Sequence, residues 1–144
     1  QSLLLNCLYA LAELQLPFDQ VKAVFELRAA CLSGYAPDLV GCHVCGSLEP
    51  TRFDLSSGLL ECAACRDTAS GGLRMPVTPS MLEAMRFICF CDPKKIFSFR
   101  LGTQELSSLS SLTEGFLTTQ LERSFPALDF FKSLRIREEK TEST

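Results

Sequence analysis

Apolar residues recur at helical spacing over most of the chain, which predicts a mainly helical domain. The first stretch covers residues 2–16, is ended by Pro17, and has a predicted inward stripe of Leu4, Leu8 and Leu11. The second covers residues 17–33 and is followed by Gly34, which stands where a helix often ends. Its predicted inward stripe is Val21, Val24, Phe25 and Leu32.

Two longer helices and one short helical piece are predicted in the second half. Thr78 and Pro79 form an N-cap and first-turn pair. The helix that they begin has inward positions at Met81, Leu82, Met85 and Cys89. Ser107–Ser111 offer further cap candidates, and Ser111 with Glu114 matches a capping box. The helix expected there runs to about Ser124, with a stripe of Leu109, Leu112, Phe116, Leu117 and Leu121. The short piece is expected at residues 128–135.

Two CxxC pairs interrupt this helical pattern, Cys42 with Cys45 and Cys62 with Cys65, separated by sixteen residues. Four thiolates at this spacing can converge on one tetrahedral Zn²⁺. Gly46 permits the positive φ that such a turn tends to need. Between the pairs, short apolar runs flank Ser56-Ser57-Gly58, which predicts a β-hairpin.

The alternatives to a zinc ribbon are two disulfides or a CxxC redox centre, and the second expects a strand-to-helix context that neither pair has. His43 could compete as a ligand, but inside a CxxC turn its ring should point outward. A zinc deaminase is excluded, because Glu61 stands where its P-C-x-x-C motif needs proline. A closed four-thiolate shell leaves no position for water, so the zinc should be structural.

The expected architecture is therefore mostly α: a helical bundle, one domain over residues 1–144, with a zinc ribbon inserted at residues 41–67. Residues 68–72 are expected to form a flexible exit, and the polar residues 137–144 a disordered tail. No run of about 18 apolar residues occurs, so no membrane span is predicted. The start at Gln1, directly in a helical pattern, suggests a fragment of a longer protein.

The remaining cysteines, Cys7, Cys31, Cys89 and Cys91, are interpreted as small buried apolar residues in a reducing cytoplasm. The net charge of −3 gives no overall attraction to nucleic acid. Residues 1–72 carry four Lys/Arg against eight Asp/Glu, and residues 73–144 carry ten against nine. Any basic surface should therefore come mainly from the second half.

Two groups of cations have both a structural and a binding interpretation. Arg28 shares a helix face with Phe25 and Leu32, where it either covers the edge of the core or forms a cation beside an apolar groove. Lys94-Lys95 and Arg100 are interleaved with aromatic residues, but this is a weak nucleic-acid motif, because Phe97 and Phe99 more simply anchor the segment on the core.

The order of these motifs resembles the RecO family of bacterial recombination mediators. The resemblance rests on Phe25-Glu26-Leu27-Arg28, Gly34-Tyr35-Ala36-Pro37-Asp38-Leu39, Cys42-x-x-Cys45-Gly46, Phe53 to Leu60, Cys62-x-x-Cys65, Phe125-Pro126 and Lys132-Ser133-Leu134-Arg135. It covers nearly the whole chain. It implies that the chain corresponds to the helical part with the zinc ribbon, and that the N-terminal OB-fold of the family is absent from it.

The resemblance also implies a scaffold and not an enzyme, in keeping with the lack of a P-loop in the sequence. Family members bind and anneal single- and double-stranded DNA in the bacterial cytoplasm, at the nucleoid. They work with RecR and in some cases RecF. They also engage the acidic, hydrophobic C-terminal tail of single-strand-binding protein through the helical domain. Another zinc-ribbon interaction module of a nucleic-acid-associated factor is the alternative.

On this resemblance, Arg28 is the candidate contact for that tail. The candidates for DNA phosphates are Lys94, Lys95, Arg100, Lys132, Arg135 and Arg137. For each of these a solvated surface position remains an equal interpretation. A cysteine-nucleophile enzyme has the least support, because the single histidine, His43, lies between predicted zinc ligands.

Overall fold

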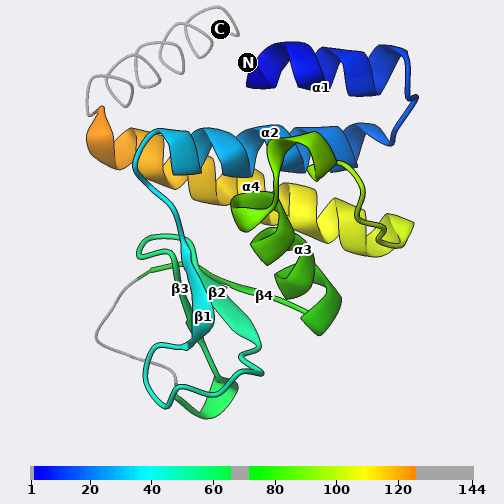
Figure 1. Ribbon diagram of the computed structural model, residues 1–144. Helices are drawn as coiled ribbons and strands as arrows, with labels where there is room; N and C mark the ends of the chain where they lie inside the picture. The colour runs from blue at the N-terminus through cyan, green and yellow to red at the C-terminus, as the bar shows by residue number, and fades with distance from the viewer. Residues whose placement is uncertain (1, 66–71, 126–144) are drawn as a thin grey trace, which may run out of the picture.

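The computed structural model describes residues 2–65 and 72–125, which form a layer of helices packed on a small sheet (Figure 1). The helices are α1 (Leu3–Ala12), α2 (Phe18–Leu32), α3 (Pro79–Phe90) and α4 (Thr103–Ser124). α2 and α4 lie side by side, α1 packs against α2, and α3 runs from the sheet toward these helices. The mostly α architecture expected from the sequence is confirmed.

The sheet consists of short strands in the order β1-β3-β2-β4. Their bounds are Asp38–Cys42 for β1, Arg52–Asp54 for β2, Leu59–Glu61 for β3 and Arg74–Pro76 for β4. β2 and β3 form the predicted antiparallel hairpin, with Phe53 opposite Leu60. β1 pairs parallel with β3, and β4 pairs antiparallel with β2. The ribbon is therefore wider than the predicted hairpin.

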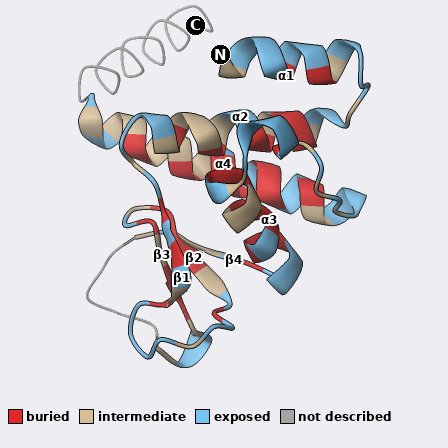
Figure 2. Cartoon of the chain, viewed as in Figure 1, coloured by how far each residue is buried: buried red, intermediate tan, exposed pale blue. Residues whose placement is uncertain are grey.

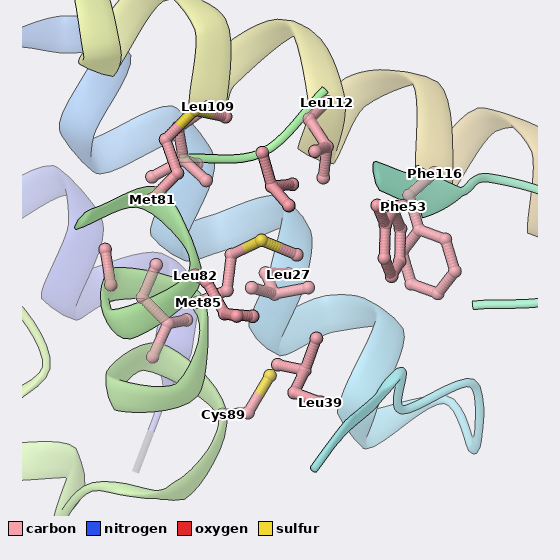
Figure 3. Close-up of a cluster of buried hydrophobic side chains, with 14 of the residues drawn as sticks. Leu27, Leu39, Phe53, Met81, Leu82, Met85, Cys89, Leu109, Leu112 and Phe116 are labelled. Atoms are coloured by element: carbon pink, nitrogen blue, oxygen red, sulfur yellow. The ribbon is translucent and has the colours of Figure 1, made fainter. Parts of the chain in front are cut away.

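One hydrophobic core joins this sheet to the helices. Phe53 of β2 packs edge-on against Phe116 of α4, with ring centroids 5.3 Å apart and an interplanar angle of 70°. Figure 3 shows these rings beside apolar side chains from α2, α3 and α4. Those side chains include Leu27, Met81, Leu82, Met85, Leu109 and Leu112. The sheet with its four cysteines and the helical layer thus share one core.

The turn of the β2–β3 hairpin rests on α4. Gly58 in this turn has a φ of +72°, and a Cβ atom there would lie 3.3 Å from the Phe116 ring. On α4, a Cβ atom at Gly115 would lie 2.9 Å from Leu55. The buried Gln120 donates from Nε2 to the Leu55 carbonyl oxygen at 2.9 Å. The two glycines let the hairpin approach the helix closely, and the glutamine satisfies the backbone there.

Arg86 of α3 makes a second polar contact between the helices and the sheet. Its Nε atom donates to the Leu39 carbonyl oxygen at 2.7 Å, and its Nη2 atom donates to the Val40 carbonyl oxygen at 3.2 Å. β1 is an edge strand of the sheet. These contacts hold that edge against the helical layer.

The structure corrects the prediction for the first helix. α1 ends at Ala12 and does not reach residue 16, and Leu4 and Leu8 are 55% and 52% exposed. Figure 2 shows that much of α1 is exposed. Cys7 and Ala10 are buried instead. The predicted stripe was wrong at Leu4 and Leu8, whereas Leu11 is half-buried and packs against this small cluster. Small side chains let α1 approach α2 closely, and periodicity alone favours the bulkier leucines.

The inward face of α2 was predicted in part. Val21 and Val24 are buried as expected, but Leu32 is 69% exposed and Phe25 lies at the surface. Leu27 fills the core in their place. In α3, by contrast, all of the predicted inward residues are buried, namely Met81, Leu82, Met85 and Cys89. The Thr78 hydroxyl accepts from the Met81 backbone N–H, as an N-cap should.

The predicted start of the last helix was wrong. α4 begins at Thr103, so Ser111 lies inside the helix and the capping box with Glu114 does not form. Two polar residues of this stretch, Ser110 and Thr113, have partners on α2 instead. The Lys22 Nζ atom of α2 donates to the Ser110 hydroxyl at 3.0 Å, and the Thr113 hydroxyl donates to a Glu26 carboxylate oxygen at 3.0 Å.

Several predictions fall outside the described residues. They are the flexible exit over most of residues 68–72, the helical piece at residues 128–135 and the disordered tail at residues 137–144. Within the described residues, no helix is both long enough and apolar enough to cross a bilayer.

Candidate metal centre

The first pair of cysteines lies in a tight turn at the end of β1. The Gly46 N–H donates to the Cys42 carbonyl oxygen at 2.9 Å, and the Cys42 N–H donates to the Ser47 carbonyl oxygen at 2.9 Å. Gly46 has a φ of +77°, so the positive φ expected at this glycine is confirmed. The turn aims both thiols away from the strand and toward the second pair.

The second pair follows β3 and is shaped by a single 3₁₀ turn, η1 (Ala63–Cys65). The Cys65 N–H donates to the Cys62 carbonyl oxygen at 3.1 Å. The Cys62 N–H donates to the Cys42 sulfur at 3.4 Å, which links the two turns. Backbone donors to a thiolate of this kind are the usual outer support of a metal ligand.

The four sulfur atoms of Cys42, Cys45, Cys62 and Cys65 all lie within 4.8 Å of one another. The Cys45 and Cys62 sulfurs are 3.8 Å apart. A tetrahedron with Zn–S bonds of about 2.3 Å has sulfur–sulfur edges of about 3.8 Å. The donor set and its spacing therefore fit Zn²⁺, and all four positions of a tetrahedral ion would be filled by protein.

The electrostatics of the four thiols also call for a cation. Burial acts to raise the pKa of Cys42, but hydrogen bonds from the backbone N–H groups of Cys45, Cys62 and Val44 lower it to about 6. A hydrogen bond to Cys45, together with burial, raises the pKa of Cys65 to about 12. The charge of a Cys42 thiolate also contributes to the raised pKa values of Cys62 and Cys65. All four can ionise only when a bound cation offsets their mutual repulsion.

His43 stays outside the sulfur cluster. It is exposed, its backbone N–H donates to the Leu60 carbonyl oxygen at 2.9 Å, and its Nε2 atom lies 3.7 Å from a Glu61 carboxylate oxygen. It does not belong to the group of possible metal ligands found among residues 2–65 and 72–125. His43 thus lies outside the sulfur cluster, as expected, but its ring faces the buried Glu61 carboxylate and does not point fully into solvent.

A buried ion cluster behind the second turn was missed by sequence reasoning. Arg74 of β4 donates from Nε to a Glu61 carboxylate oxygen at 2.7 Å, and its Nη2 atom lies 3.9 Å from an Asp54 carboxylate oxygen. The Glu61 side chain is 1% exposed. Because Glu61 immediately precedes Cys62, the cluster fixes the strand that carries this ligand. The sequence signal for this cluster was an acidic residue in each hairpin strand, Asp54 in β2 and Glu61 in β3.

Arg28 lies at the junction of α2 and α3. Its Nη1 atom donates to the carbonyl oxygens of Cys89 at 3.3 Å and Ile88 at 3.5 Å, in the last turn of α3. A cation there offsets the negative end of the helix dipole. Its half-buried position fits the interpretation as an edge-of-core residue. Its Nε and Nη2 atoms make no hydrogen bond with a described residue, so further donors are available.

The candidate phosphate contacts are only partly described. Lys94 and Lys95 lie in the 3₁₀ turn η2 (Pro93–Lys95), and both are exposed, as is Arg100. None of the three forms an ion pair with a described residue. Lys94 and Arg100 line different hollows of the surface. The other candidates lie outside the described residues: Lys132, Arg135 and Arg137.

The aromatic residues beside these cations are not free stacking platforms. Phe97 and Phe99 are half-buried and pack against the main core. The Phe99 ring also meets the Phe87 ring edge-on, with centroids 6.2 Å apart. The simpler interpretation of this segment, as an anchor on the core, agrees with the structure.

Comparison with known proteins places this arrangement in context. A family model described as "Recombination protein O C terminal" matches residues 2–129. A protein named DNA repair protein RecO from Acetivibrio thermocellus is 31% identical over 138 residues, which are 92% of this chain and 53% of that protein.

Two further relatives carry the same name. The protein from Syntrophotalea carbinolica is 30% identical over 121 residues, 81% of this chain and 45% of its own length. The protein from Rubrobacter xylanophilus is 39% identical over 88 residues, 59% of this chain and 35% of its own length. The chain spans about half the length of the first two relatives, and less of the third.

Loss of one ligand should affect zinc content and stability together. We expect Cys65→Ser to lower zinc affinity at least tenfold and to destabilise the chain, because metal binding contributes on the order of 10 kcal/mol to the folding of such sites. Zinc analysis after dialysis and urea unfolding of the same samples would measure both effects. Cys91→Ser is the matched control, since Cys91 is also half-buried but lies outside the cluster. Equal zinc content in both variants would refute the assignment.

Proposed function

The chain belongs to the RecO family, and from that membership we propose that it is the helical, zinc-bearing part of a DNA repair protein that acts in homologous recombination. The observation that carries this proposal is the family match over residues 2–129 on a chain whose four CxxC cysteines converge. The repair role of the relatives is given by their names. In this proposal the chain works as a scaffold and catalyses no reaction.

The proposed metal is a single structural Zn²⁺ held by Cys42, Cys45, Cys62 and Cys65. The ion would link the two CxxC turns that follow β1 and β3, in addition to the hydrogen bonds that already join them. A shell closed by four thiolates leaves no open position for a substrate or an activated water. The metal would therefore stabilise the ribbon and take no part in chemistry.

The proposed partner of Arg28 is the acidic, hydrophobic C-terminal tail of single-strand-binding protein. Phe25 and Leu32 stand three and four positions from Arg28 on α2, and both reach the surface. An apolar side chain of the tail could pack between them, while a carboxylate accepts from the Arg28 donors that α3 does not use. This support comes from chemistry and placement, and it extends what the family resemblance implies.

DNA binding and the remaining partners are proposed for the whole protein. Lys94, Lys95 and Arg100 are exposed cations suited to phosphate contacts, and we propose the same role for Lys132, Arg135 and Arg137. Single- and double-stranded DNA, RecR and in some members RecF complete the set that the family implies. The proposed site of action is the bacterial cytoplasm, at the nucleoid.

The tail-binding proposal predicts a specific effect of Arg28. A labelled peptide with the acidic tail sequence should bind the zinc-loaded chain saturably, and Arg28→Ala should weaken binding at least tenfold, because charge-assisted hydrogen bonds contribute about 1.5–3 kcal/mol. Fluorescence anisotropy measures the affinity. Arg52→Ala is the control, since Arg52 is also half-buried but lies on β2. Binding that both variants weaken equally, or no binding at all, would contradict this role.

The DNA proposal predicts a salt-dependent loss. Replacing both Lys94 and Lys95 by Ala should weaken binding of a labelled single-stranded oligonucleotide and reduce the slope of log K against log salt by about 1.4, about 0.7 for each lost phosphate contact. The double Lys→Arg variant keeps both charges and should retain the slope. An unchanged slope in the Ala variant would show that these lysines make no phosphate contact.

A further inference from the structure

Two cysteines outside the metal centre face each other across a helix junction. Cys31 lies in the last turn of α2 and Cys89 in the last turn of α3, 58 positions apart in sequence. Their sulfur atoms are 3.5 Å apart, which is within hydrogen-bond distance for two thiols. This contact lies between two helices that pack in the same core.

The pair does not extend to a metal site. Among residues 2–65 and 72–125, the only group of three or more possible ligands is the four-cysteine cluster of the ribbon. Cys31 and Cys89 thus form a site of two thiols. The reaction open to two thiols at this separation is disulfide formation, which needs the sulfurs to approach by about another 1.5 Å.

The surroundings give the two thiols different roles. The hydrogen bond with Cys89 lowers the pKa of Cys31 to about 7, against the opposing effect of burial, and the Arg28 charge adds to the lowering. The hydrogen bond to Cys31, together with burial, raises the pKa of Cys89 well above its ordinary value. Cys31 is also the more exposed of the two. A half-exposed thiolate beside a protonated partner is the arrangement that peroxides oxidise selectively.

Arg28 explains why a thiolate is tolerated at this junction. The ends of α2 and α3 both present the negative end of a helix dipole, which disfavours an anion. The Arg28 guanidinium donates to the carbonyl oxygens of Ile88 and Cys89 and so offsets that field. Arg28 stands three positions before Cys31 on α2 and binds the backbone of Cys89 on α3, so its positive charge lies near both thiols.

We propose that Cys31 and Cys89 are a reversible redox pair, which a peroxide converts into a disulfide that joins α2 to α3. The Cys31 thiolate attacks one peroxide oxygen and the O–O bond breaks. With hydrogen peroxide this gives a Cys31 sulfenic acid and hydroxide, which takes up a proton. The Cys89 thiol then attacks the Cys31 sulfur, and the sulfenic oxygen leaves as water. Two molecules of a small thiol restore the pair and leave as their own disulfide.

The disulfide would close a loop that contains the whole ribbon, since residues 32–88 lie between the two cysteines. Closing a long loop restricts the unfolded chain. The oxidised form should therefore have a higher thermal midpoint than the reduced form. It should also hold the α2–α3 junction in one arrangement beside Arg28.

The test uses the zinc-loaded chain and a stoichiometric amount of hydrogen peroxide. After free thiols are blocked by alkylation, peptide mapping should find Cys31 linked to Cys89, with the mass of two hydrogen atoms lost, and a dithiol should reverse the link. Zinc content measured in the same samples should stay constant, which separates this reaction from oxidation of the ribbon. Alkylation of Cys31 and Cys89 to the same extent as the buried Cys7 would overturn the proposal.

Two variants assign the roles within the pair. Cys89→Ser should leave a Cys31 sulfenic acid that a 1,3-dione reagent captures, whereas Cys31→Ser should give neither the disulfide nor the captured adduct. Cys91→Ser is the control and should still form the Cys31–Cys89 link. A link from Cys31 to Cys91 in the unaltered chain, or loss of the link in the control, would refute the assignment. If a variant folds poorly, the peptide map of the unaltered chain still tests whether Cys31 and Cys89 form a disulfide.

Discussion

The ribbon depends on one electrostatic constraint: four thiols whose sulfur atoms all lie within 4.8 Å of one another. Such a group can carry four negative charges only around a cation. The strands that lead into it are short, and both β2 and β3 contain three residues. Strands of this length are not stable as an isolated hairpin in water. The proposed Zn²⁺ would therefore stabilise the ends of β1 and β3, while the core shared with the helices stabilises the rest of the sheet.

The helices meet the ribbon through three different kinds of contact. Phe53 and Phe116 provide apolar packing, and Gln120 satisfies backbone carbonyl groups of the hairpin. Arg86 of α3 donates hydrogen bonds to the backbone of the edge strand β1. These contacts come from α3 and α4, and the ribbon supplies Leu39, Phe53 and Leu60 to the core that it shares with the helices. Sheet and helices therefore form one interdependent structure, to which the four-cysteine cluster is attached through β1 and β3.

The sequence indicated those features that depend on local spacing. The CxxC pairs, the positive φ at Gly46 and the N-cap at Thr78 are set by neighbouring residues, and all three agree with the structure. Features that depend on distant partners were missed. β4 forms only because it pairs with β2, and Ser110 looked like part of a helix start because its partner, Lys22 of α2, lies 88 positions away. The same limit hid the Arg74 ion cluster and the approach of Cys31 to Cys89.

The proposed zinc site is defined by the atoms that coordinate the metal. X-ray absorption at the zinc edge, measured on the chain purified without chelators, tests this most directly. We predict a single shell of four sulfur atoms at about 2.3 Å, with no lighter neighbour. Nitrogen or oxygen ligands at about 2.0 Å, for example from His43 or from water, would contradict a closed four-cysteine site. A folded chain that holds no zinc would contradict the account as a whole.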